Sequence, residues 1–348
     1  MKQAGPGKRG RRPTIIDVAR EARVGVMTVS RVINNYKTVR PSTRAKVMGA
    51  IAKVGYRPND AARMLKGMQA RTISLVIPDL SDFFSSCFHA VQDVAIAREY
   101  QTMVVATGRN PKVEDQQLES IKSHRTAGVI LVSSGGDIRL LQALQESGIP
   151  IVALDRPVQG LKADSVLIEN REGAEAGVRH LIEHGHKNIC CLSFRSGSFT
   201  VQERIEGYEQ AMRRAGLKPQ VYDKLNSLDA VERLAASWKR TGEHPTAIFT
   251  TKRITSILVV QALHRFGLRM PQDIAMVGFD DFDLAEALAP PLTVVGQSTA
   301  DLARSATELL FKQIDRLQQG EGAEYRPVKT LFPTTLIIRE SCGCTSQR

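Results

Sequence analysis

The sequence lacks any long hydrophobic run. Its 348 residues contain no apolar stretch near the length of about 18 residues that a membrane-spanning helix needs. The first residues, MKQAGPGKRGRRP, are basic and rich in glycine and proline, so they do not contain the apolar region of a secretory signal peptide. We therefore expect a soluble, cytoplasmic protein that does not associate with membranes.

Cysteine is scarce, and the five cysteines occur without a secretory signal, so we expect reduced thiols rather than disulfides. Cys190 and Cys191 lie in the apolar run NICCLSF and are expected in a core. Cys342 and Cys344 could bind a metal ion, but two nearby thiolates are half of a site.

The histidines do not supply the remaining ligands of a metal site, as far as sequence spacing can show. His180, His184 and His186 lie close together in the sequence, but no acidic or thiol residue is spaced to complete a site with them. We therefore expect no bound metal and no cofactor.

Nucleotide-binding signatures are also missing. From Arg71 onward, apolar runs alternate with helix-length amphipathic segments, which is typical of buried parallel strands joined by crossover helices. No GxGxxG or Walker A motif follows any of these runs, so an enzyme that uses a nucleotide finds no support. The predicted strands are TISLVI, TMVVA, GVILV, PIVAL, NICCLSF, TAIFT and IAMVGF.

Positive charge is concentrated at one end of the chain. Residues 1–67 contain 16 Lys or Arg against three acidic residues, whereas the other 281 residues carry a net charge of −1. A run of charge is usually a solvated surface, but an excess confined to one segment suits a polyanion such as DNA.

That basic segment contains two short amphipathic runs in TIIDVAREARVGVMTVSRVIN, residues 14–34. Thr14 can cap the first helix with Asp17 three residues on, and Ile16, Ala19 and Ala22 form its expected buried stripe.

The second helix restarts near Val26 after the break RVG. Its expected inward residues are Val29, Val32 and Ile33, and its outer face reads Met27, Ser30, Arg31 and Asn34. Such an outer face could lie in a major groove, so the pair indicates a helix-turn-helix, with two ordinary core helices as the alternative.

A third helix and a short turn complete this region. Ser42 can cap the third helix, and Gly55 supplies its left-handed end. After a turn at 56–59, residues 60–66 could form one helical turn that is too short to be stable alone. The expected inward residues of the third helix are Val47, Ala50, Ile51 and Val54.

These motifs resemble the lactose-repressor (LacI) family of bacterial transcription regulators. The resemblance covers nearly the whole chain, and several motifs in the right order are far more specific than any one alone. In order, they are TIIDVA, TVSRVIN, GYRPNDAARML, LDRP, ENREGA, HLIEHGHKNI, ERIEGY, VGFDD, PPLTVV and RESCG.

The resemblance implies a mixed fold, in which an all-α helix-turn-helix DNA-binding domain precedes a two-lobed α/β domain similar to periplasmic binding proteins. It implies crossovers near 169, 296 and 332. The expected parts are a basic disordered tail (1–13), the DNA-binding domain (14–59), a hinge helix and linker (60–70), an effector-binding and dimerisation domain (71–340) and a tail (341–348). Lobe 1 would hold about 71–169 and 296–332, and lobe 2 about 170–295 and 333–340.

The same resemblance assigns residues to an interface with a pseudo-palindromic double-stranded DNA operator. Val26, Met27 and Arg31 match positions that read bases. Thr28 and Ser30 match positions that contact phosphates, although they could be ordinary surface hydroxyls. Leu65 matches a leucine that wedges into the minor groove, with an ordinary apolar linker residue as its alternative. The remaining expected DNA-binding residues are Thr14, Asn34, Tyr56, Asn59 and Ala62.

The sequence departs from the family at EARVGV, where glycine at the turn and serine at the cap are usual. Arg23 would have to adopt the turn conformation without glycine's freedom, and Gly25 caps a helix less well than serine. We expect a somewhat less stable helix-turn-helix.

A small-molecule effector is the second partner that the resemblance implies, bound between the lobes. Members that bind neutral sugars usually have Asn-Asp where this chain has Lys252-Arg253. The added positive charge favours an anion, such as a sugar acid or phosphosugar. Alternatively, Lys252 pairs with Asp280 or Asp155 and fills the site; a neutral sugar is the least favoured outcome. The expected effector-binding residues are Phe84, Asp155, Ile168, Arg204, Lys252, Arg253, Asp280 and Gln297.

A homodimer is expected, because one helix-turn-helix buries little surface on DNA and the sequence shows no leucine heptads for a tetramer. Three functions therefore compete. A ligand-responsive repressor accounts for both halves of the chain. A solute-binding protein fails on the helix-turn-helix and the missing signal peptide. An α/β enzyme would need a nucleophile–base pair that we do not find, so we expect no catalytic residues.

Overall fold

The structure, a computed structural model, describes residues 13–33, 36, 38–56, 71–124, 126–194, 197–225, 227–320 and 325–344. The chain forms two compact units, Met1–Ala70 and Arg71–Arg348. Nearly all of the predicted basic tail and the whole predicted hinge helix lie outside the described residues. The same is true of four expected DNA-binding residues, namely Asn34, Asn59, Ala62 and Leu65.

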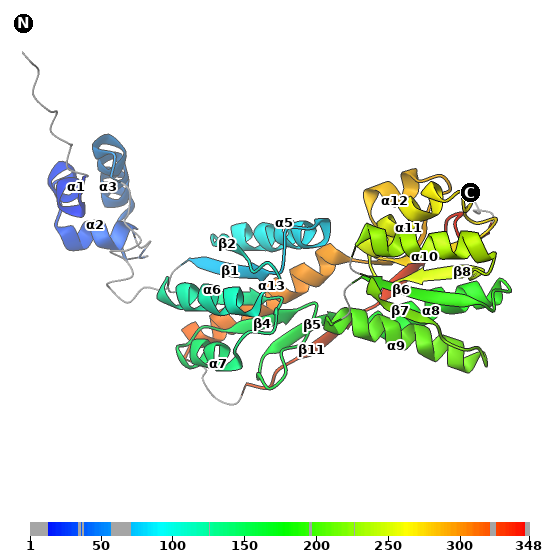
Figure 1. Ribbon diagram of the computed structural model, residues 1–348. Helices are drawn as coiled ribbons and strands as arrows, with labels where there is room; N and C mark the ends of the chain where they lie inside the picture. Colours follow the sequence, from blue (N-terminus) through cyan, green and yellow to red (C-terminus); the bar gives the residue numbers. More distant parts are fainter. Residues whose placement is uncertain are drawn as a thin grey trace, which may run out of the picture. The chain divides into compact units, whose positions relative to one another are not determined.

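The first unit contains three helices around a small apolar core (Figure 1). Val18, Val29 and Val47, one from each helix, are fully buried, so packing holds together helices that are too short to be stable alone. The predicted helix-turn-helix is confirmed. The helices are α1 (Ile15–Ala22), α2 (Val26–Ile33) and α3 (Pro41–Val54).

The start of α1 follows the prediction, and so does its buried stripe except at Ile16. The Asp17 carboxylate accepts hydrogen bonds from the Thr14 backbone nitrogen at 2.8 Å and from its hydroxyl at 2.7 Å. The prediction that Ile16 is buried is wrong, since this side chain is 53% exposed. Ala19 and Ala22 face the core as predicted. Ile15 and Val18 join them, which gives the i, i+3, i+4 and i+7 spacing of one helix face.

The third helix begins one residue before the predicted cap. Arg40 takes the capping position and Pro41 the first helical position, where the missing N–H of proline would be unpaired in any residue. Ser42 is therefore inside the helix. Gly55 ends it with φ 67°, as predicted.

The turn between α1 and α2 places Arg23 in the left-handed conformation expected from the sequence. Arg23 is left-handed, with φ 51° and ψ 46°, a region that costs a residue with a β-carbon about 1–2 kcal/mol.

Replacing Arg23 with glycine should therefore stabilise the first unit by about 0.5–1 kcal/mol. Hydrogen exchange of the buried amides of α1 to α3 in the full-length chain would measure the gain. Arg20→Gly is the matched control, because Arg20 lies inside α1 and glycine there should cost about 1 kcal/mol. Equal effects of the two substitutions would contradict this account.

The second unit is built on two six-stranded sheets, each covered by helices on both faces (Figure 1). The first sheet has the order β11-β5-β4-β3-β1-β2 and is parallel throughout. The second has the order β12-β10-β9-β8-β6-β7, with β12 antiparallel to β10. The first sheet contains β1 (Thr72–Ile77), β2 (Gln101–Ala106), β3 (Gly128–Leu131), β4 (Ile151–Leu154), β5 (Asp164–Ile168) and β11 (Lys329–Phe332). The second contains β6 (Ile189–Phe194), β7 (Val221–Leu225), β8 (Ala247–Thr250), β9 (Ala275–Phe279), β10 (Thr293–Gln297) and β12 (Thr334–Ile337).

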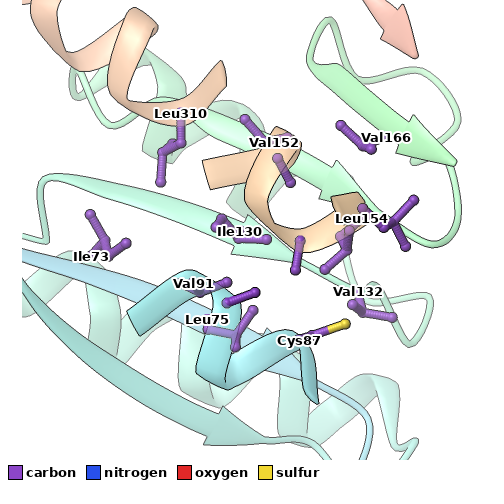
Figure 2. Packing of buried hydrophobic residues seen from close by; sticks show 14 of the residues in the cluster. Ile73, Leu75, Cys87, Val91, Ile130, Val132, Val152, Leu154, Val166 and Leu310 are labelled. Atoms are coloured by element: carbon purple, nitrogen blue, oxygen red, sulfur yellow. The ribbon is translucent and has the colours of Figure 1, made fainter. Parts of the chain in front are cut away.

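Lobe 1 is the first sheet with four helices, two on each face. Figure 2 shows strand residues such as Leu75, Ile130 and Val152 in one apolar cluster with Val91 of α5 and Leu310 of α13. The opposite face packs against α6 and α7. The helices of lobe 1 are α5 (Asp82–Ala97), α6 (Pro111–Ser123), α7 (Ile138–Glu146) and α13 (Thr299–Gln318).

Lobe 2 is the second sheet with its helices. Cys191 faces the core against α8 and α9, and its neighbour Cys190 faces the core against α10 and α11, because successive strand residues point to opposite faces. The prediction that both are core residues is confirmed. The helices of lobe 2 are α8 (Asn170–Glu183), α9 (Phe199–Arg214), α10 (Leu228–Thr241), α11 (Arg253–Arg265) and α12 (Asp283–Ala287).

The chain passes between the lobes from β5 to α8, from β10 to α13 and from β11 to β12. The prediction of a tail from residue 341 is wrong at its start. Ser341 is fully buried, and its hydroxyl donates to the Met276 carbonyl and accepts from the Thr293 nitrogen. Cys342 beside it is 1% exposed. Among the described residues, no helix is long and apolar enough to span a membrane.

Candidate functional site

The outer face of α2 presents the residues expected to read DNA. Met27 is 73% exposed and Val26 is 41% exposed, although both are apolar. The Arg31 guanidinium is exposed and makes no hydrogen bond or ion pair with any described residue. A free guanidinium on a helix that keeps its other face in the core can form two hydrogen bonds with a guanine.

The other expected DNA-binding residues of the first unit are less accessible. Thr28 and Ser30 are half-buried on α2, and Tyr56 packs at the edge of the helical core. The Thr14 hydroxyl donates to Asp17, as described above. The roles of these residues on DNA remain predictions.

A second group of polar residues gathers at the carboxyl ends of the parallel strands in both lobes, a position where α/β folds commonly bind ligands. The Arg253–Asp82 ion pair links α11 of lobe 2 to α5 of lobe 1. Asp155 and Asp280 directly follow β4 and β9, and both adopt positive φ angles, 67° and 73°. We call this group the interlobe cluster, which comprises Arg109, Asp155, Arg156, Arg204, Lys252, Arg253, Asp280 and Gln297.

Arg204 of α9 is the most tightly held member of the interlobe cluster. It is 4% exposed, and its Nε donates to Asn170 Oδ1 at 2.8 Å. One terminal nitrogen donates to the Thr251 carbonyl at 2.8 Å and pairs with Asp280 at 3.2 Å. The guanidinium stacks on the Phe279 ring, 3.7 Å from its centroid. These contacts hold the Arg204 guanidinium in one orientation.

Asp280 is occupied by partners other than Lys252. One carboxylate oxygen accepts from Arg204, and the other accepts from Gln297 Nε2 at 2.7 Å. The other polar atom of the same amide, Gln297 Oε1, is buried and has no hydrogen-bond partner among the described residues. This orphaned oxygen could accept a hydrogen bond from a ligand.

On the lobe 1 side, Asp155 is buried and pairs with Arg156 at 3.3 Å. Arg156 also donates to the Ser133 carbonyl at 3.2 Å, yet its Nε is buried without a partner among the described residues. Arg109 forms an ion pair with Asp79.

Lys252 is the unpaired cation of this arrangement. Within the described parts of the chain its ammonium has no hydrogen bond and no ion pair, and the carboxylate of the nearby Asp280 has other partners. Burial, followed by the positive charges of Arg109 and Arg204, lowers the pKa of Lys252 to about 8, and Asp280 opposes the shift. An unpaired, partly desolvated ammonium is costly unless an anion joins it.

Two expected effector-binding residues are apolar and buried. Phe84 and Ile168 are 5% and 4% exposed and belong to the apolar core of lobe 1. Sequence reasoning also missed Asn170, Arg109 and Arg156. Asn170 stands in the motif ENREGA, and the two arginines follow strand ends, which is the signal that could have found them.

A third group corrects the expectation that His180 and His184 lack a thiol partner. Cys344 Sγ lies 3.3 Å from His180 Nε2 and 3.1 Å from His184 Nε2. Sequence spacing could not show this, because folding brings together residues 160 or more positions apart.

Comparisons with known proteins agree with this two-part geometry. The family model described as "Bacterial regulatory proteins, lacI family" matches residues 14–59, and "Periplasmic binding protein-like domain" matches residues 178–342. The HTH-type transcriptional repressor PurR of Photobacterium profundum is 30% identical over 94% of this chain and 98% of its own length.

Solved structures share the fold. The lac repressor dimer bound to operator and the anti-inducer ONPF superposes with a TM-score of 0.82 at 25% identity, covering 95% of this chain and 99% of that one. The transcriptional regulator CelR in complex with cellobiose has a TM-score of 0.68 at 30% identity, covering 95% of this chain and all of that one.

Proposed function

Since the chain belongs to the lacI family of bacterial regulatory proteins, we propose that it represses transcription as a homodimer on a pseudo-palindromic operator and is controlled by an anionic effector between its lobes. The exposed, unpaired Arg31 on α2 supports the DNA-binding part. The charge of residues 1–67 adds the sequence-independent attraction to phosphates. A similar protein, the lac repressor, is a dimer on its operator.

Selection of bound sequences from random duplexes tests the DNA-binding part. The purified chain should enrich one sequence with two inverted half-sites, because a two-fold dimer presents α2 twice. Enrichment of single half-sites would contradict the dimer, and no enrichment over a salt-sensitive background would contradict specific recognition.

The effector part rests on one observation, the unpaired ammonium of Lys252 beside Arg109, Arg156 and Arg204. A carboxylate or phosphate there would pair with Lys252 and could accept from the free Arg156 Nε. Sugar hydroxyls on the same ligand could donate to the free oxygen of Gln297. A sugar acid or phosphosugar satisfies all three groups. The competing idea that Lys252 fills the site by pairing with Asp280 or Asp155 loses support, since both carboxylates have other partners.

A thermal-shift screen of sugars, sugar acids and sugar phosphates should find the anions stabilising. Lys252 loses its proton as the pH rises through about 8, so anion binding should weaken between pH 7 and pH 9. Lys252→Asn should reduce the shift and remove that pH dependence.

Lys239→Asn is the matched control, because Lys239 is an exposed lysine on α10 of the same lobe. It should leave both the shift and its pH dependence unchanged. Stabilisation by neutral sugars alone would overturn the anionic effector, and no response to any class would favour a regulator without a small-molecule effector.

A further inference from the structure

The end of the described chain returns to lobe 2 and is anchored there. The buried Ser341 hydroxyl bridges β9 and β10, as described above. Cys342 follows, with its sulfur 3.2 Å from the Thr293 hydroxyl. Gly343 has φ 88°, a left-handed conformation that glycine adopts without strain. These contacts fix Cys342 and Cys344 beside α8.

Two histidines of α8 meet these cysteines. His180 and His184 are four residues apart and therefore on one helix face, with ring centroids separated by 4.3 Å. His184 Nδ1 lies 2.7 Å from the His180 carbonyl. Because a carbonyl can only accept, Nδ1 carries the proton, and Nε2 keeps a lone pair directed at Cys344.

This tautomer is the one that a metal ligand needs. Metal-binding histidines usually donate their second ring N–H to a carbonyl or carboxylate, which orients the ring. The ligand atoms of His180, Cys342 and Cys344 all lie within 4.8 Å of one another. In a tetrahedral zinc site, a sulfur and a nitrogen ligand are about 3.5 Å apart. The observed 3.1 and 3.3 Å separations at Cys344 are close to this value.

We propose that His180, His184, Cys342 and Cys344 bind one zinc ion as a structural site. Two thiolates and two imidazoles are a ligand set that zinc favours, and four protein ligands leave no open position for catalysis. The ion would fasten the chain end to α8 of lobe 2. The site is separate from the interlobe cluster and the DNA-binding face, so it does not depend on their proposed functions.

Metal content of the full-length chain, purified without a histidine tag, tests the proposal. After incubation with zinc sulfate and removal of unbound metal, elemental analysis should find about one zinc per chain. Cobalt(II) in its place should give the sulfur-to-cobalt charge-transfer and visible d–d absorption of a tetrahedral thiolate site.

Cys344→Ser and His184→Ala should each reduce zinc to well below one per chain. Both side chains are at least partly exposed, and circular dichroism would check that the variants fold. His186→Ala is the matched control, because His186 lies two residues from His184 but has no hydrogen bond to either cysteine among the described residues. This variant should retain the ion. Zinc should raise the melting temperature of the wild type but not of Cys344→Ser.

Three results would overturn the site. The first is a wild-type chain that binds no zinc, and the second is full zinc retention in both Cys344→Ser and His184→Ala. The third is a Cys342–Cys344 disulfide in the protein as isolated under reducing conditions, detected by mass spectrometry.

Discussion

Arg204→Ala is expected to lower the free energy of unfolding of lobe 2 by about 3–5 kcal/mol. Arg204 is buried, and its guanidinium satisfies Asn170, the Thr251 carbonyl and Asp280 at once. Alanine would leave the Asp280 carboxylate without its cation and two buried oxygens without donors. The stacking on Phe279 would also be lost. Such a loss is large because the partners remain buried after the substitution.

The single tryptophan makes this change measurable. Trp238 is buried in the core of lobe 2, so its fluorescence during urea unfolding reports on that lobe. Arg171→Ala is the matched control, because Arg171 also pairs with carboxylates, Glu203 and Glu206, but its side chain is 40% exposed. That ion pair should contribute less than about 1 kcal/mol. If both variants lost the same free energy of unfolding, burial would not explain how much the Arg204 contacts stabilise lobe 2.

Most of the strands predicted from sequence are buried along their length, and β2 is the exception. Seven predicted runs all form strands, and most are buried along their length because helices cover both faces of a parallel sheet. The sequence does not predict β7, β11 or β12, which are short and partly exposed. β5 (DSVLI) and β10 (TVVGQ) are buried too, but polar residues and a glycine shorten their apolar runs to two or three residues, which is too little to predict a strand.

Some site residues could be identified from local sequence spacing, and others only from the folded structure. The outer face of α2 follows from helical spacing, so Met27 and Arg31 could be identified locally. Six members of the interlobe cluster came from resemblance and two, Arg109 and Arg156, did not. The pairings of all of them depend on which carboxylate each cation reaches. Asp280 pairs with Arg204 and Gln297 rather than with Lys252, and this choice depends on distances between side chains from separate parts of lobe 2. The histidine–cysteine group is not predicted at all, because its members become neighbours only in the folded lobe.

Arg31→Ala is expected to weaken binding to the selected operator by roughly tenfold to a hundredfold, which corresponds to about 1–3 kcal/mol. The reason is the position of Arg31 on α2. Val29 and Val32 hold one face of α2 in the core, so the side chain at position 31 projects from the opposite face. Its guanidinium has no competing partner among the described residues, and no internal ion pair has to be broken when it meets a base edge.

Titration of wild-type and variant chains against the operator, single-base variants of it and unrelated duplex would separate base reading from phosphate contact. If Arg31 reads a guanine, Arg31→Ala should lose affinity mainly for the operator and become tolerant of substitution at one base pair in each half-site. Arg20→Ala is the control. Arg20 is an exposed arginine of α1 that pairs with Asp17, and its removal takes away one charge without changing the preference for any base. If Arg31→Ala instead reduced affinity for all duplexes alike, with a salt dependence shallower by about one ion per half-site, Arg31 would be a phosphate contact and another residue of α2 would have to read the bases.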